Sequence, residues 1–364
     1  MKPIFNLLFV ALSIFLLPSC GKKSHNELKT LDILSASRRS VSRPVSDFGS
    51  LKLLPLQTTD SCLIKNISEL LFEKDCILVV HDNRCSVFGT DGKYLNDIGR
   101  KGDGPQEYLS IGNVFYRDGN VRIFDNGRHR LLTFSRKGNY QSAASIPTDI
   151  SLLHQTANGL FAGYIVHREG NEPTRIKFLN AEGSAMDSIP YARSYTSKKG
   201  IQAWYYFAEA CFCNYGNMTD MKALFCDTIF SIQASHPQMS PRYALNLGEF
   251  ALKAEDRYNL ESPRQNLFKG KKFIGNIFET KDYLFLNGGM GFDGDACFVY
   301  NKKNGILAYT YIRYALQEEK LFNKKYFIPK ALSPDGGTLI SYEIPAAVDG
   351  QEESNPVLSV LALK

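Results

Sequence analysis

The chain has 364 residues, of which 22% are charged and 44% are hydrophobic, and its formal net charge is +6. This excess is mild, and the basic residues are scattered without a stripe or a recognition module, so we predict no nucleic-acid partner. The eight cysteines do not have the spacing of a small disulfide-stapled scaffold, and isolated cysteines in strand-like runs are often small buried apolar residues.

The first nineteen residues have the features of an export signal. Lys2 precedes an apolar run from Ile4 to Leu17 that is too short to span a membrane comfortably. Leu17-Pro18-Ser19-Cys20 follows and resembles the lipobox of bacterial lipoproteins. We therefore predict a signal peptide over residues 1–19 and a lipid on Cys20, which makes the membrane a partner. The alternatives are an ordinary signal peptide with an incidental cysteine, or an uncleaved anchor helix.

The residues after Cys20 bear on location. Gly21 lacks the aspartate that retains some lipoproteins in the inner membrane, and Lys22-Lys23-Ser24 lacks the acidic run of a surface-export signal. We expect attachment to the outer membrane, facing the periplasm. Few apolar residues occur up to Ser46, which favours a flexible, lipid-anchored tether over residues 20–48. The folded domain is then predicted over residues 49–364.

Short alternating apolar segments separated by Asp-Gly or Asn-Gly pairs dominate the rest of the chain, which is typical of β-hairpins. The segment Ile77–Asp82 repeats at Val121–Asp125, with its aspartates 43 residues apart, and the turn glycines Gly92 and Gly138 are 46 apart. This is the period of a propeller blade. Helical patterns are scarce, and we expect only short helices, at 260–268 and 314–322.

The period predicts an all-β fold, a six-bladed β-propeller of four-stranded antiparallel blades, although seven blades also fit the length. We expect the ring to be closed by its N-terminal strand. Leu51–Leu56 would complete the last blade beside Thr338–Tyr342 and Val357–Leu361, because closure removes the exposed edges that invite aggregation.

Several motifs resemble those of the 6-bladed β-propeller lipoprotein family of Gram-negative bacteria, whose propellers are of the NHL/TolB-like type. They are Leu54–Asp60, Ile98–Tyr108, Asp227–Ile232 and Tyr243–Gly248. The Gly-x-Gly-Pro-x-Glu-Tyr element at 102–108 is fairly specific, whereas the strand patterns would fit any propeller, including NHL-repeat proteins. Gln57 stands where Glu is usual, and Gln106 where Gly is common. The resemblance implies architecture and location but no reaction.

Two segments are candidate ligand sites. The loop Gly99–Pro105 carries Arg100, Lys101 and Asp103 and has the glycines of an anion-cradling loop. It is also explained as a tight crossover between the first two blades, which we favour. The aromatic run with Trp204 and Tyr205 is either a stacking platform for a sugar or peptide, or, as we favour, packing between blades.

A third set lies at blade turns. Arg128 and His129, near Asp125, are candidate ligand-binding residues, and His81-Asp82 occupies the matching turn of the preceding repeat. Their histidines and aspartates would form a general base pair if they converged on the central channel. An aspartate that bonds its own turn backbone explains the repeat without chemistry.

Metal and catalytic motifs are weak. Cys211-Phe212-Cys213 lacks the second ligand pair of a zinc site, and Asp293 with Asp295 lacks calcium-loop spacing. We expect no metal, no cofactor and no catalytic residue, and lean against an enzyme. The predicted function is a non-catalytic binding or assembly module for an envelope protein, peptide or glycan. The alternative is an extracytoplasmic hydrolase or lyase acting on glycan or peptide at the channel mouth.

Overall fold

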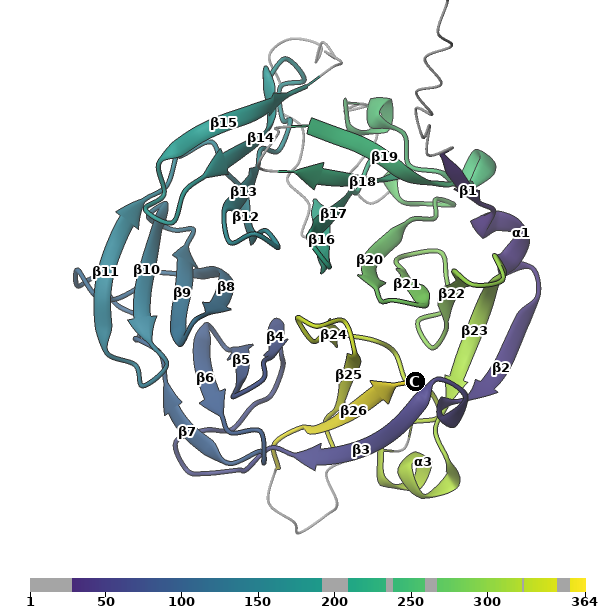
Figure 1. Cartoon of the computed structure of the whole chain (residues 1–364), viewed down its shortest axis with the longest axis horizontal. Coiled ribbons are helices and arrows are strands. Elements are labelled where there is room, and N and C mark those ends of the chain that lie inside the picture. Colours follow the sequence, from purple (N-terminus) through teal and green to yellow (C-terminus); the bar gives the residue numbers. More distant parts are fainter. Residues whose placement is uncertain (1–27, 192–208, 234–237, 259–266, 323, 346–353) are drawn as a thin grey trace, which may run out of the picture.

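The computed structural model describes residues 28–191, 209–233, 238–258, 267–322, 324–345 and 354–364. Six antiparallel sheets stand around a central axis like the blades of a propeller (Figure 1). Each blade has four antiparallel strands, which follow chain order from the innermost strand to the rim in blades one to five, whereas the rim strand of blade six is β3 from the N-terminal part of the chain. The predicted six-bladed all-β fold of four-stranded blades is therefore confirmed.

The first three blades are each formed by consecutive strands. Blade one contains β4 (Glu69–Phe72), β5 (Ile77–His81), β6 (Arg84–Phe88) and β7 (Tyr94–Asp97). Blade two contains β8 (Ile111–Arg117), β9 (Asn120–Asp125), β10 (Arg130–Ser135) and β11 (Tyr140–Ser145). Blade three contains β12 (Leu152–Gln155), β13 (Phe161–Tyr164), β14 (Thr174–Leu179) and β15 (Ala185–Pro190).

The other three blades also include strands from the N-terminal part of the chain. Blade four contains β16 (Ala210–Tyr215), β17 (Met218–Ala223), β18 (Thr228–Gln233) and β19 (Gln238–Leu245), with β1 (Lys29–Leu31) outside. Blade five contains β20 (Ile274–Glu279), β21 (Tyr283–Gly288), β22 (Cys297–Asn301) and β23 (Leu307–Arg313), with β2 (Ser40–Pro44) outside. Blade six contains β24 (Ala331–Leu332), β25 (Thr338–Glu343), β26 (Val357–Leu363) and β3 (Gly49–Pro55).

The ring closes in blade six as predicted. β3 pairs antiparallel with β26, with Leu54 opposite Leu358 and Leu51 opposite Leu361. The buried side chain of Asn355 strengthens this junction by accepting a hydrogen bond from Ile64 N at 2.7 Å and donating to Gln57 O at 2.8 Å. The two ends of the propeller sequence are thus joined by a backbone ladder and by a side-chain clasp.

The tether prediction is wrong for the described residues 28–48. β1 and β2 add in parallel to the outer strands β19 and β23, and the short helix α1 (Ile33–Ser37) and the 3₁₀ turn η1 (Val45–Asp47) connect them to the ring. Leu31, Ile33, Val45 and Phe48 are buried against blades four to six. A segment with few apolar residues is ordered here because its backbone extends two sheet edges and four of its apolar residues are buried.

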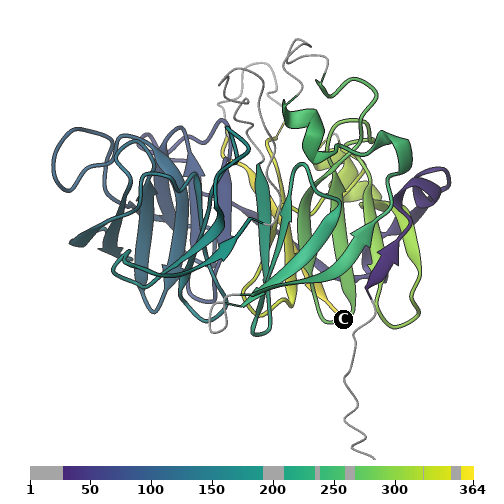
Figure 2. The same ribbon diagram turned by 90° about the horizontal axis from the view of Figure 1, so that it is seen from above.

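The hydrophobic core lies between neighbouring blades. Six clusters of buried residues each fill one blade junction. The turns between the second and third strands of a blade, and the connections from one blade to the next, gather on one face. In Figure 2 this is the upper face, with η3 (Gly248–Phe250) and η4 (Ala254–Tyr258), whereas β1 begins near the C-terminus at the lower side.

Helices are minor elements of the described chain. α3 (Leu316–Phe322) falls within the helix expected at 314–322, and most of the other expected helix, at 260–268, lies outside the described residues. Among the residues that the structure describes, none of the helices has both the length and the apolar character needed to cross a membrane.

Candidate functional site

The most prominent concave feature is the channel along the propeller axis. It has a volume of about 810 Å³ and is lined by the inner strands β4, β8, β12, β16 and β20 and by β24 with its flanks (Figure 1). Sites for small organic ligands usually measure roughly 300–1,000 Å³. The channel is therefore large enough to hold a small ligand rather than only water.

Polar side chains of the inner strands connect each blade to the next around this channel. Glu69 Oε2 accepts a hydrogen bond from Val114 N at 2.9 Å. Asn113 Oδ1 accepts from Leu153 N at 3.3 Å, in the same relation one blade further on. An innermost strand has one unpaired edge, so these side chains satisfy backbone groups that would otherwise face the channel.

The remaining junctions are bridged by other means. Asn214 Nδ2 donates to the carbonyl of Gln155 at 2.9 Å, and Glu279 N donates to Cys213 Sγ at 3.2 Å. Asn287 Nδ2 donates to Pro329 O at 2.7 Å, and the Tyr342 hydroxyl donates to Ile67 O at 3.1 Å. Hydrogen bonds from side chains of the first or second strand therefore cross all six blade junctions around the channel.

Burial shifts the protonation equilibria of several titratable groups in the channel wall. Burial raises the pKa of Glu69 to about 7 against the opposing hydrogen bond from Val114 N. Burial, with a smaller contribution from Asp75, raises the pKa of Glu73 to about 7. Burial also lowers the pKa of His154 to about 4, so its ring is neutral at pH 7, and it lowers the pKa of Lys330.

His154 presents a flat aromatic surface in the channel wall. Its ring lies 4.8 Å from that of Phe212 at an interplanar angle of 7°, and its Nε2 is 3.2 Å from Asn214 Oδ1. Asn214 Oδ1 also accepts from the Thr219 hydroxyl while the amide nitrogen donates to Gln155. His154 Nε2 must therefore carry the proton, which leaves its Nδ1 as an acceptor.

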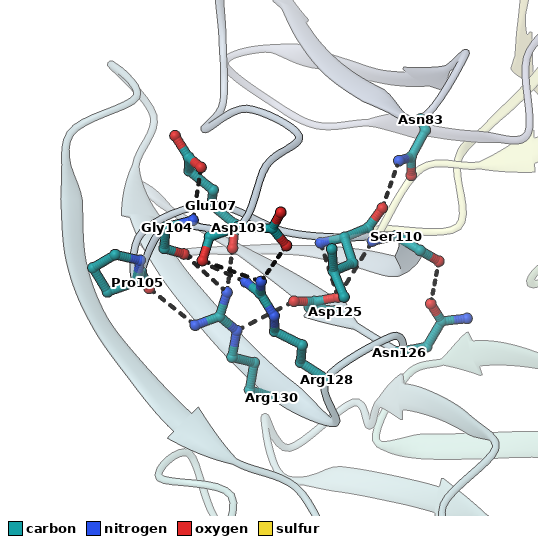
Figure 3. A network of polar contacts seen from close by, with 11 residues as sticks. Asn83, Asp103, Gly104, Pro105, Glu107, Ser110, Asp125, Asn126, Arg128 and Arg130 are labelled. Carbon is teal, nitrogen blue, oxygen red and sulfur yellow. Dashed lines mark hydrogen bonds and ion pairs between the residues drawn. The ribbon is translucent and has the colours of Figure 1, made fainter.

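The glycine-rich loop lies where it was expected, between β7 and β8 at the junction of blades one and two, but Arg100 and Asp103 already have charged partners. Figure 3 shows the pair of Asp103 with Arg128. Glu107 accepts from Gly104 N at 2.8 Å and from Arg100 Nε at 2.5 Å. Arg128 Nη2 donates to Asp103 Oδ1 at 2.8 Å. Lys101 is exposed and pairs through its backbone with Tyr108. These contacts favour the crossover interpretation over the anion cradle.

Arg130, which sequence reasoning missed, anchors this loop to blade two. Its guanidinium donates to Pro105 O at 3.0 Å, to Glu107 O, and to the buried Asp125 Oδ2 at 3.2 Å. Asp125 Oδ1 also accepts from the backbone N–H groups of Leu109 and Ser110. Figure 3 shows these side chains pointing at the loop backbone, so the cluster positions the crossover.

The hypothesis that turn histidines and aspartates converge on the channel is wrong. Neither His81, Asp82, Asp125 nor His129 lines the described channel. His81 is buried within blade one, with Nε2 2.9 Å from Ser86 Oγ, and Asp82 and Asn83 have φ of 47° and 58° in a tight hairpin turn. His129 has φ 48° at the corresponding turn of blade two and packs edge-on against Phe124. The repeat therefore reflects turn geometry.

Other predicted site residues lie outside the described residues or are used structurally. Cys20, Trp204 and Tyr205 lie outside the described residues. Cys211 and Cys213 are free thiols on one face of β16, and no group of three or more metal-ligating side chains occurs in the described part of the chain. Asp293 accepts a hydrogen bond from the Tyr311 hydroxyl at 2.6 Å and one from Asp295 N at 2.9 Å.

The channel residues Glu69, Asn113, His154 and Asn214 were also missed. One weak signal was available in the sequence. Each is a polar residue in the first strand of its repeat, where an apolar residue would otherwise be expected. Their neighbours in space come from the next repeat, roughly one blade away in sequence, so the meeting of these groups could not be read from any local motif.

Comparisons with known proteins support the architecture. A family model described as "Domain of unknown function (DUF4934)" matches residues 28–361. A candidate exported protein of Bacteroides fragilis NCTC 9343 has a similar structure, with a TM-score of 0.66 and 17% identity, covering 93% of this chain and 99% of that one. A member of the DUF4221 family from Bacteroides vulgatus has a TM-score of 0.52 and 9% identity, covering 87% and 97%. No curated protein matches the chain.

Proposed function

Because the chain belongs to the family described as Domain of unknown function (DUF4934), a description that names no activity, we propose its function from its geometry. It is an extracytoplasmic binding module that holds a neutral glycan fragment in the central channel. The observation that carries this proposal is the combination, in one channel of about 810 Å³, of aromatic rings with uncharged hydrogen-bonding groups.

Sugars present two kinds of surface, and the channel offers a counterpart to each. Apolar C–H faces of a pyranose pack on aromatic rings, and Phe72, Phe212 and Phe278 lie in the channel wall. Hydroxyl groups need both donors and acceptors, which Asn276 and the neutral His154 supply. A charged ligand is disfavoured, because the Glu69 and Glu73 carboxyl groups are partly protonated at pH 7 and residues of both signs, with Arg117 and Lys330 among the cations, line the channel.

An extracytoplasmic location is part of the proposal. It is supported by the signal peptide predicted over residues 1–19 and the sequence before Cys20 that resembles a lipobox, and by the fold relative from Bacteroides fragilis, which is a candidate exported protein. We propose that Cys20 carries a lipid that anchors the chain to the periplasmic side of the outer membrane. The anchor is tested by metabolic labelling with a fatty acid, because the label should be present in the unmodified chain and absent from Cys20→Ala. If protease treatment of intact cells removes the protein, the periplasmic orientation is refuted.

The described chain also bears on how such an anchored propeller would stand. Only seven residues lie between Cys20 and Leu28, so the two can be at most about 28 Å apart at full extension. β1 begins at the lower side of the propeller in Figure 2, opposite the long loops. The anchored protein would therefore stand close to the bilayer with its loop face turned away, toward soluble or wall-bound ligands.

The test is a glycan array probed with the full chain in mild detergent, followed by titration of each hit. We expect Asn276→Ala and Phe278→Ala, which alter the channel wall, each to lower the affinity about tenfold or more. The matched control Asn304→Ala changes an asparagine in an exposed turn of the same blade and should leave the affinity unchanged. If a glycan binds both channel variants as tightly as the unmodified chain, the channel is not the binding site. If no glycan on the array binds, the proposal of a glycan ligand is wrong.

One observation favours a second candidate function, a hydrolase or lyase acting at the channel. Glu73 is a half-buried channel carboxyl group with a pKa of about 7, a value suited to a general acid or base. An enzyme would convert bound glycans slowly in the array, and Glu73→Gln would abolish product formation while retaining binding. If glycans are recovered intact after incubation with the unmodified chain, the hydrolase or lyase function is excluded and the binding function is kept.

A further inference from the structure

A second cavity lies apart from the channel, under the loops between blades three and four. Its volume is about 30 Å³, and its walls include His167, Arg175 and Arg257 with the rings of Tyr164 and Tyr258. This space admits one or two water-sized groups. None of these residues lines the channel, so what the cavity binds is independent of the channel function proposed above.

His167 is a buried polar group that faces this cavity. Only 5% of its surface is exposed, and neither ring nitrogen has a hydrogen-bond partner among the described residues. The carboxylate oxygen Glu172 Oε2 lies 3.7 Å from Nδ1, and that carboxylate already accepts the backbone N–H groups of residues 168 to 170. A neutral imidazole has one N–H donor, and buried donors are normally satisfied. His167 therefore offers a hydrogen-bond donor to an occupant of the cavity.

Arg175 provides a positive charge beside this donor. Its guanidinium lies 5.5 Å from the centre of the Tyr191 ring and 5.8 Å from that of Phe230, and its Nε has no hydrogen-bond partner among the described residues. Arg257 differs, because its guanidinium is bonded to the Glu209 carboxylate in a buried ion pair. Among the described residues that line the cavity, Arg257 therefore has a carboxylate partner and Arg175 has none, and the Glu172 carboxylate lies behind His167 as the counter-charge beside the site.

We propose that this cavity is an anion site that binds a single carboxylate group, with the Arg175 guanidinium and the His167 ring N–H as its donors. A planar carboxylate matches the forked guanidinium, and its size suits the small cavity better than a tetrahedral phosphate or sulfate. The carboxylate group has two sources, a free small carboxylate such as acetate or the C-terminus of a peptide that enters from the loop face.

The test is calorimetric titration of the full chain in mild detergent, at fixed ionic strength, with sodium acetate, with the dipeptide Gly-Ala, and with Gly-Ala amide. We expect acetate to bind, and Arg175→Gln to weaken its binding about tenfold or more through loss of a charged hydrogen-bond donor. The matched control is Arg122→Gln. Arg122 is also a half-buried arginine but lies on blade two, so this variant should retain the affinity for acetate. Gly-Ala binding with no amide binding identifies a peptide C-terminus, and acetate binding alone identifies a free carboxylate.

A second pair of variants separates ligand binding from folding. Arg175→Lys keeps the positive charge and should retain most of the affinity for acetate. His167→Phe removes the ring N–H donor and should lower the affinity for acetate several-fold. The melting temperature of each variant shows whether it is folded. The proposal is overturned if the unmodified chain binds neither acetate nor Gly-Ala, or if folded Arg175→Gln binds acetate as tightly as the unmodified chain. Loss of glycan binding in the channel with acetate binding retained would leave this site standing.

Discussion

Glu69 and Asn113 perform the same task one blade apart, because each accepts a hydrogen bond from the inner strand of the following blade. The physical demand is the same, a backbone N–H at the channel edge that needs an acceptor. The chemical outcome differs, because only Glu69 can ionise. The pKa of Glu69 is raised to about 7, so this residue joins a structural role to a protonation equilibrium inside the proposed ligand channel.

Glu73 allows the cost of such burial to be measured. Its pKa is raised to about 7 in the folded chain by burial, with Asp75 adding to the effect, against about 4.3 in an unfolded chain. The folded state therefore holds the proton more tightly, and stability is greatest below about pH 4 and falls as the pH rises through 7. We predict that Glu73→Gln raises the free energy of unfolding at pH 8 by roughly 1–3 kcal/mol relative to the unmodified chain.

Urea unfolding at pH 4, 6 and 8 measures this effect. The difference between Glu73→Gln and the unmodified chain should vanish at pH 4, where both side chains are neutral. Glu182→Gln, at an exposed turn, is the control and should show no such trend. A constant difference across the three pH values would show that the raised pKa does not govern the effect.

The glycine-rich loop provides a second prediction at this scale, since two of its ion pairs differ in burial. Asp103 is 93% exposed where it meets Arg128, whereas Arg130 is 17% exposed and its partner Asp125 is fully buried. We predict that Asp103→Ala changes the free energy of unfolding by less than about 0.5 kcal/mol. Arg130→Ala should lower it by about 3 kcal/mol, because it leaves a buried carboxylate short of a partner. Equal effects in urea unfolding would contradict the assignment of Arg130 as the anchor.

At the scale of elements, the blades were predictable because their signals are local. Tight turns need residues with positive φ, and Asp82 and Gly92 mark the two successive turns of blade one in this way. The N-terminal arm was not predictable in the same way. Its strands β1 and β2 have little apolar content, and what orders them is pairing with strands roughly two hundred residues or more away in sequence. The composition of a segment indicates how much apolar surface it can bury, but it does not predict with which sheet edge the segment pairs.

The arm prediction is tested by one buried side chain. Ile33 in α1 is fully buried against blades four and five. Ile33→Ala should lower the free energy of unfolding by about 2–4 kcal/mol, whereas a flexible tether would show no change. Ile306→Ala is the control, because Ile306 is 58% exposed and its loss should matter little. Urea unfolding followed by far-ultraviolet circular dichroism compares the two variants.

At the scale of the whole molecule, the six-bladed ring could be predicted from its period, whereas the channel could not. Its wall is assembled from six strands whose side chains meet only after the ring has closed, so no stretch of sequence contains the constellation. The same is true of the small cavity, where His167 comes from blade three and Arg257 from η4 in the connection after blade four. A propeller sequence therefore predicts its scaffold well and its binding chemistry poorly, because the scaffold repeats and the site does not.

Closure of the ring makes the strongest prediction at this scale, because one buried side chain links the two ends of the propeller sequence. Asn355 is 2% exposed, accepts from Ile64 N at 2.7 Å, and donates to Gln57 O at 2.8 Å and to Cys62 O at 3.0 Å. Replacement by alanine removes the partner of Ile64 N and of Gln57 O, each at a cost of about 1–3 kcal/mol before relaxation, whereas Cys62 O keeps its hydrogen bond from Thr59 N. We predict that Asn355→Ala lowers the free energy of unfolding by roughly 3 kcal/mol.

The location of the clasp also predicts how the variant unfolds. Blade six contains both ends of the ring, so a weakened junction should open there first, and hydrogen exchange should quicken in β3 and β26 before it does in blades two and three. Asn139→Ala, at an exposed turn of blade two, should change neither stability nor exchange. Uniform acceleration across all blades in Asn355→Ala would mean that the ring unfolds as a unit, and that Asn355 stabilises the whole propeller without marking the point where it opens.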